Sequence, residues 1–174
     1  MIKSQKVFFG LILVLGFVYM YPASPEFPVP PPDSVQSMEP ADTETPLRRA
    51  YFTNYTREQV IEHYKAHFDR KVMFNLNYPP EDAQTLIRDQ TRSWYLEELV
   101  HPMRESLFIN GFIPQEKKDD IWYKGQHFEE KITIRYIPSG WWARIVVLTA
   151  TTLLGYLLMR EWWKDLIRLS ELRR

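Results

Sequence analysis

The chain of 174 residues contains no cysteine, which excludes a disulfide framework, a thiolate zinc site and a cysteine nucleophile. Glycine is scarce, at six residues, and neither of the glycine-rich phosphate-binding patterns, GxxxxGKS/T and GxGxxG, occurs. The GxSxG and SxxK signatures of serine hydrolases are also missing. The sequence therefore predicts a protein that is not an enzyme, with no catalytic residue, no metal ligand and no bound cofactor.

An excess of basic charge is missing as well. The chain holds 22 Lys plus Arg and 22 Asp plus Glu, and its central region, residues 22–140, holds 14 basic against 19 acidic residues. Because binding to a phosphate backbone needs a basic face, this acidic region argues against nucleic acid as a partner. The compensating basic residues lie beside two apolar segments near the ends of the chain.

The C-terminal apolar segment, residues 141–159, predicts a transmembrane helix. Its 19 residues give roughly 28 Å of helix at about 1.5 Å per residue, close to the roughly 30 Å of a bilayer's hydrocarbon core. Arg144 is its only charged residue, and it lies one turn from the end, where a long side chain can extend to the headgroups. A buried core helix of a soluble protein is the alternative. The residues expected at the membrane interfaces are Trp141, Trp142, Arg144, Trp162 and Trp163.

The N-terminal apolar segment resembles a signal-type sequence in its pattern. A basic entry with Lys3 and Lys6 precedes 15 apolar or aromatic residues, 7–21. We expect residues 1–21 to form a cytoplasmic N-terminus and an uncleaved transmembrane anchor, because no small-x-small cleavage pattern follows; a cleaved signal peptide is the alternative. No Lys or Arg follows Lys6 until Arg48, so the positive-inside rule places the N-terminus in the cytoplasm and the central region outside.

Two further segments flank the predicted domain. Residues 22–46 hold eight of the 13 prolines and five acidic residues without a base, which predicts a Pro-rich acidic linker of extended polyproline II character. Residues 160–174 are expected to form a cytoplasmic basic tail, either as an amphipathic helix in the interface or as a short solvated extension of the span. The apolar residues of this tail at helical spacing are Trp162, Leu166, Leu169 and Leu172.

The central region 47–138 predicts a folded extracytoplasmic domain. Residues 49–55 are rich in β-formers and predict a strand, and Thr56 followed by Gln59 has the spacing of a capping box for a helix over 57–68. The apolar face of this helix comprises Val60, Ile61, Tyr64 and Phe68.

The next segments show first the two-residue period of a strand and then the pattern of a helix. Residues 71–78 predict a half-buried strand with Val72, Phe74, Leu76 and Tyr78 on its buried face. Prolines and acids at 79–82 predict the start of a second helix reaching about Gln90, with Ala83, Leu86 and Ile87 as its apolar face. Residues 93–100 fit a strand and a helix equally well.

The last part of the domain predicts a helix and a hairpin. Residues 103–109 are expected to be helical and to end at Asn110-Gly111. Strands over 121–123 and 128–137 are expected to pair with a turn between them. The expected fold class is therefore α+β: a small antiparallel sheet with helices on one face, flanked by N- and C-terminal transmembrane helices.

Few residues of this domain point to chemistry. His63 and His67 have the i, i+4 spacing of many two-histidine metal sites, but no acid converges on them in sequence, so two surface histidines are the better interpretation. The adjacent carboxylates Glu97-Glu98 and Glu129-Glu130 are expected on solvated faces. Aromatic residues of the domain are expected in its core rather than in a ligand groove.

The sequence thus predicts a membrane-anchored, non-catalytic interaction or assembly subunit that presents an extracytoplasmic α+β domain. Its expected partners are the lipid bilayer and other membrane proteins, with homo-oligomerisation left open and nucleic acid excluded. A bacterial cytoplasmic membrane is favoured over an organellar inner membrane. The alternative is an extracytoplasmic metal-dependent hydrolase using His63 and His67, or a ligand-binding sensor domain.

Overall fold

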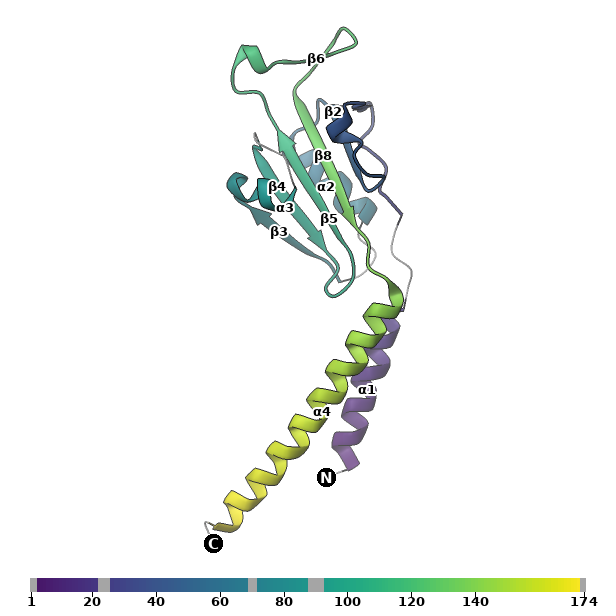
Figure 1. Cartoon of the computed structure of the whole chain (residues 1–174), viewed down its shortest axis with the longest axis vertical. Coiled ribbons are helices and arrows are strands. Elements are labelled where there is room, and N and C mark those ends of the chain that lie inside the picture. Colours follow the sequence, from purple (N-terminus) through teal and green to yellow (C-terminus); the bar gives the residue numbers. More distant parts are fainter. Residues whose placement is uncertain (1–2, 22–25, 69–71, 88–92, 173–174) are drawn as a thin grey trace. The chain divides into compact units, whose positions relative to one another are not determined.

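The computed structural model of the chain describes residues 3–21, 26–68, 72–87 and 93–172. It divides into two compact units, one formed by Pro25–Pro138 and the other by Met1–Ser24 together with Ser139–Arg174. The first unit is an α+β domain and the second is a pair of helices (Figure 1).

The domain is built on a six-stranded, fully antiparallel sheet in the order β1-β2-β8-β5-β4-β3 (Figure 1). A separate two-stranded hairpin, β6 with β7, lies between β5 and β8 in the sequence and outside this sheet. Short 3-10 turns lie at Pro40–Asp42, Pro80–Asp82 and Lys117–Asp119. The strands are β1 Val35–Gln36, β2 Arg48–Thr53, β3 Phe74–Tyr78, β4 Tyr95–Val100, β5 Ser106–Phe112, β6 Ile121–Tyr123, β7 Gln126–Phe128 and β8 Glu130–Ile137.

Helix α2, Arg57–Phe68, covers one face of the sheet. The predicted capping box is confirmed: the Thr56 amide donates to Gln59 Oε1 at 2.9 Å, and the Gln59 amide donates back to Thr56 Oγ1 at 3.4 Å. The predicted apolar face is also confirmed, because Val60, Ile61, Tyr64 and Phe68 are buried. They pack on the alternate residues of the central strands, which include Leu99, Leu107, Ile109, Ile132 and Ile134.

The opposite face carries a second, smaller cluster, so the expectation of helices on one face only is corrected. Leu86, in the short helix α3 (Ala83–Leu86), packs with Ile87 against Leu96 and Phe108. The helix predicted to reach Gln90 is thus a single turn within the described residues, and positions 88–90 lie outside them. We call these the α2 face and the α3 face of the sheet.

Tertiary pairing overturns two of the local predictions. Residues 106–112, expected to be helical up to Asn110, form the strand β5 between β4 and β8, because Leu107 and Ile109 alternate onto the α2 face. The strand expected over 128–137 is divided: residues 126–128 form β7 and pair with β6, whereas β8 pairs with β2 and β5. The ambiguous segment 93–100 contains the strand β4.

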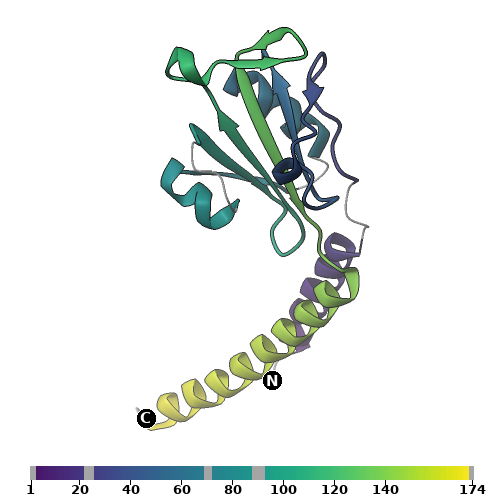
Figure 2. The ribbon, with the colours of Figure 1, turned by 45° about the horizontal axis from the view of Figure 1, so that its top comes forward.

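The second unit consists of α1, Lys3–Met20, and α4, Trp141–Leu172, which pack side by side in antiparallel orientation (Figures 1 and 2). Gly16 gives room for Leu148, since a Cβ atom at position 16 would lie 2.6 Å from Leu148 Cδ1. The rings of Phe9 and Tyr156 meet edge to face at 5.6 Å. These contacts place the start of α1 level with the later part of α4.

Only one described helix is long and apolar enough to cross a membrane, namely the Trp141–Arg168 part of α4. The apolar stretch of α1, Lys6–Met20, is shorter than a usual span, so the expected N-terminal transmembrane helix is not among the candidate spans of the described residues. Of the most apolar 18-residue stretch of α4, 11 % is buried within the structure. The helix continues without interruption from the apolar segment into the tail residues 160–172.

Candidate functional site

The most unusual surface of the domain is the edge strand β3. The sequence predicts Phe74 and Leu76 on a half-buried face, but their side chains are 57 % and 44 % exposed. Val72, just before the strand, is also exposed. The prediction was wrong because β3 is the last strand of the sheet and only Tyr78, at its far end, packs against the cluster under α3.

This edge is open. Among the strands that the structure describes, none pairs with the outer side of β3, so half of its backbone N–H and C=O groups face away from the sheet. The strand FNLNY contains no charged residue and no proline, which are the usual protection of an edge. The opposite edge is protected by brevity, since β1 has two residues. The two edge strands therefore differ: β1 is very short, whereas β3 is longer and carries neither a charge nor a proline.

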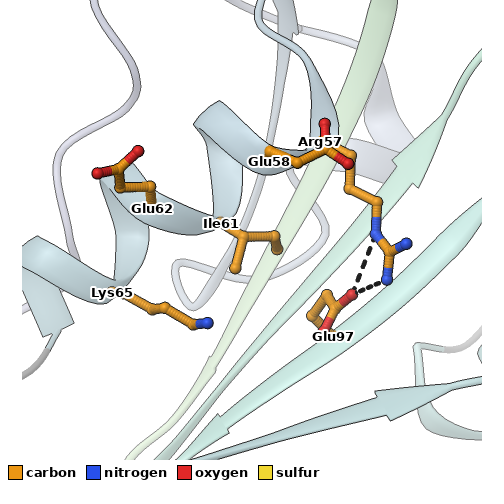
Figure 3. A pocket seen from close by; sticks show the side chains of 6 residues that line it. All are labelled: Arg57, Glu58, Ile61, Glu62, Lys65 and Glu97. Atoms are coloured by element: carbon orange, nitrogen blue, oxygen red, sulfur yellow. Dashed lines mark hydrogen bonds and ion pairs between the residues drawn. The ribbon is translucent and has the colours of Figure 1, made fainter.

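A charged cavity lies on the α2 face beside this edge (Figure 3). Asn77 of β3 is paired in register with Glu97 of β4, and Glu97 forms the floor of a cavity of about 370 Å³. One flank of α2 forms its wall and carries two basic and two acidic side chains. The lining residues are Arg57, Glu58, Ile61, Glu62, Lys65 and Glu97.

The floor of the cavity is held by an ion pair between the buried Glu97 and the partly exposed Arg57. Glu97 is 3 % exposed, and both Nε and a terminal nitrogen of Arg57 donate to its Oε1 atom, the former at 3.1 Å (Figure 3). The guanidinium carbon of Arg57 also lies 5.3 Å from the ring centre of Tyr95. Arg57 therefore compensates the buried carboxylate and covers an aromatic ring at the same time.

A second buried carboxylate, Glu130, lies behind this pair. Its side chain accepts a hydrogen bond from the hydroxyl of Tyr95, and the residue is 2 % exposed. Burial raises the pKa of the Glu130 carboxyl to about 7; the charge of Glu58 adds to the rise, while the hydrogen bond from Tyr95 and the charge of Arg57 oppose it. Burial and the neighbouring Glu130 likewise raise the pKa of Tyr95. The pKa of the Glu130 carboxyl therefore lies close to neutral pH.

On the α3 face, the edge strand is linked to β4 by a side-chain hydrogen bond. The hydroxyl of Tyr78 donates to Glu98 Oε2 at 2.7 Å. This bond, more than burial, raises the pKa of Tyr78 to about 12. The Glu98 carboxylate therefore has a hydrogen-bond donor within the domain, on the neighbouring strand β3.

The predicted membrane-interface residues lie in the helical unit. The side chains of Trp141, Trp142 and Trp162 are exposed and that of Trp163 is partly exposed. Arg144 is buried within the helical unit. Its guanidinium donates to the carbonyl oxygens of Met20 at 3.4 Å and Ser139 at 2.7 Å, so it satisfies a backbone acceptor at the C-terminus of α1.

The two histidines of α2 lie together but are engaged with backbone carbonyls. The rings of His63 and His67 are 4.2 Å apart, with His63 Nε2 3.0 Å from the Val29 carbonyl and His67 Nδ1 2.7 Å from the His63 carbonyl. A carbonyl partner requires a protonated nitrogen, so these two atoms are donors. Within the described ranges, no group of three or more His, Asp or Glu side chains is arranged to hold a metal ion.

Sequence reasoning missed Glu97 and Glu130 as parts of the site. Both were expected on solvated faces, but each lies on the buried α2 face of its strand. Their alternation with buried apolar neighbours was the available signal, since Glu97 lies between Tyr95 and Leu99 at a spacing of two. This spacing indicates burial of Glu97 only if the segment is already known to be a strand.

The site combines outward backbone donors and acceptors, exposed apolar side chains and a cavity with charges of both signs. Comparison of the chain with protein-family models, with curated proteins and with solved structures finds no match. The functional argument therefore rests on the geometry of the chain itself.

Proposed function

We propose that this protein is a membrane-anchored, non-catalytic interaction or assembly subunit, whose α+β domain binds another polypeptide along the open edge of β3. The observation that carries the proposal is the exposure of Phe74 and Leu76 on an uncharged edge strand. Soluble domains normally shield such edges with charges, prolines, bulges or a covering element. An edge left open in this way is the structural requirement for strand addition by a partner.

The cavity beside β3 supports the same proposal. A strand added to this edge continues the sheet, and its side chains on the α2 face are directed to the same side as Asn77 and Glu97. Backbone hydrogen bonds along β3 supply affinity without dependence on sequence, and the neighbouring charges of Arg57, Glu62 and Lys65 supply selectivity. A small-ligand sensor is the second candidate, favoured by the cavity alone.

Membrane anchoring is supported by the two packed helices. The charge-free stretches Val7–Tyr21 and Ile145–Met159 have equal length, and the antiparallel packing aligns them. Their outer surfaces expose apolar side chains, among them Val7, Leu11, Val146 and Leu158. Because such surfaces are costly in water, we propose that both helices lie in a bilayer, with α1 completing a hairpin whose longer member is α4.

The charge pattern supports one orientation of this hairpin. Lys3 and Lys6 begin α1, and the antiparallel packing brings them level with the part of α4 that carries Arg160 and Lys164. The positive-inside rule then places both chain termini in the cytoplasm and the domain outside it. A bacterial cytoplasmic membrane is favoured and an organellar inner membrane is also compatible.

The interaction is tested by site-specific photo-crosslinking of the full-length protein in native membranes. A photoreactive residue at Asn75, on β3, is expected to give adducts of defined mass. The matched control carries the same residue at Glu129, whose side chain is 73 % exposed outside the edge. Adduct formation at Asn75 no greater than at Glu129 would refute an interaction at this edge.

The topology is tested separately with single cysteines, because the natural chain has none. A membrane-impermeant maleimide added to intact cells is expected to label Trp122→Cys, in the β6–β7 hairpin, and to label Ser170→Cys only after the membrane is opened. The reverse labelling pattern contradicts the proposed orientation.

A further inference from the structure

We propose that the polypeptide bound along β3 is a second copy of this chain, paired antiparallel to the first about a two-fold axis through Leu76. This inference rests on the proposed function, in which β3 is an interaction edge, and names its partner. The result is an isologous dimer with one continuous twelve-stranded sheet, twice the six strands of the domain.

The sequence of β3 is complementary to itself in this register. A two-fold axis at Leu76 places Leu76 opposite its own copy, Asn75 opposite Asn77, and Phe74 opposite Tyr78. Because side chains alternate, the apolar and aromatic residues meet only on the α3 face and the asparagines only on the α2 face. Each asparagine amide carries both a donor and an acceptor, so opposed asparagines can pair with one another.

The pattern of charge also fits a second copy. Like charges facing each other across a two-fold axis destabilise a homodimer, and β3 has none. Of the two acidic residues of β4 that pair in register with β3, Glu97 is neutralised by Arg57, and Glu98 accepts a hydrogen bond from Tyr78 of β3 itself. An identical strand without charges needs no counter-charge along β3.

Burial gives the pairing a driving force. Phe74 and Leu76 are among the exposed apolar side chains of the domain, and a second copy places Phe74, Leu76 and Tyr78 of each chain in two adjacent rows on the α3 face. Transfer of this apolar surface from water stabilises the dimer in addition to the backbone hydrogen bonds. Anchoring of both copies in one membrane raises their effective concentration.

Single cysteines test the contact in the full-length protein in membranes. Leu76→Cys is expected to give a disulfide-linked dimer on mild oxidation, because the axis places the two introduced thiols on directly opposed residues. The matched control is Trp122→Cys in the β6–β7 hairpin, where the native side chain is 67 % exposed. A dimer yield for Leu76→Cys no higher than that of Trp122→Cys would overturn the inference.

The register is tested with two differently tagged copies. A mixture of Asn75→Cys and Asn77→Cys chains is expected to form more mixed dimer than either self-dimer, because residues 75 and 77 oppose each other only in the antiparallel arrangement centred on Leu76. Excess self-dimer of either variant contradicts that arrangement.

A disruptive variant separates this inference from the proposed function. Leu76→Lys brings two ammonium groups together at the axis, and we expect at least tenfold less co-purification of differently tagged copies. If Asn75 instead crosslinks to a different protein and never to its own copy, the proposed function stands and the homodimer is rejected. If Asn75 gives no adduct above the Glu129 control, both are rejected.

Discussion

The hydroxyl of Tyr95 reaches the carboxylate of Glu130 across the backbone of Gly111. The three residues belong to neighbouring strands, with Tyr95 paired to Gly111 and Gly111 paired to Ile132 of β8. A Cβ atom at position 111 would overlap the tyrosine ring and lie 2.5 Å from Glu130 Oε1. The glycine is therefore required by close approach of its neighbours, since the strand itself favours residues with side chains.

Gly111→Ala is expected to destabilise the domain by about 2 kcal/mol, because the buried ring of Tyr95 has no room to move away from an added methyl group. The measurement is urea unfolding of the full-length protein in detergent, followed by tryptophan fluorescence. Tyr95→Leu removes the ring atoms that clash, so the double variant Tyr95→Leu/Gly111→Ala should lose less stability than the two single changes added together. Strict additivity of the two effects contradicts the overlap.

The raised pKa of the Glu130 carboxyl predicts that the stability of the fold depends on pH. Its pKa is raised from 4.5 to about 7 in the folded chain, so between these values the folded state binds more protons than the unfolded state. The stabilisation is complete below about pH 4.5 and is lost as the pH rises through 7, with a total of about 3 kcal/mol for a shift of this size.

The comparison of Glu130→Gln with the natural chain isolates this group. The glutamine variant should lack the loss of stability between pH 5 and pH 8, because an amide does not ionise. The control Glu129→Gln changes the exposed neighbouring carboxylate and should keep the full pH dependence. An unchanged pH profile in Glu130→Gln would show that another group is responsible.

The ion pair in the cavity floor predicts an asymmetric response to mutation. Arg57→Met leaves the buried Glu97 carboxylate without its cation and is expected to cost about 2 kcal/mol, while Arg57→Met with Glu97→Gln should recover part of this loss. The control is Lys118→Met, which breaks an exposed pair with Glu116 at 2.7 Å and should cost less than about 0.5 kcal/mol. Equal costs for the two single variants would contradict the role of Arg57 in compensating the buried Glu97 carboxylate.

The helix pair predicts a steric requirement at Gly16. Gly16→Val places a branched side chain against Leu148 and is expected to separate α1 from α4, whereas Gly10→Val is expected to be tolerated because no atom lies within 4 Å of its added Cβ. The readout is the yield of intramolecular crosslinking by a short bismaleimide between Phe9→Cys and Tyr156→Cys, whose native rings are in contact. Similar yields in the two valine variants argue against close packing at Gly16.

Local signals in the sequence determined several elements by themselves. The capping box at Thr56 and the apolar stripe of Val60, Ile61, Tyr64 and Phe68 predict α2 with its bounds and its buried face, because both are interactions between residues a few positions apart. The long apolar run likewise predicts α4, since length and composition alone decide whether a helix can cross a bilayer.

Only the tertiary structure decided which strands are central and which is the edge. The sequence predicts a half-buried strand at β3 and a helix at β5, yet Leu107 and Ile109 of the strand β5 are buried and Phe74 and Leu76 are not, because β5 has a strand on each side and β3 has one. The burial of Glu97 and Glu130 follows from the same pairing, which joins residues far apart in sequence. Strand order is a property of non-local contacts, and no local periodicity encodes it.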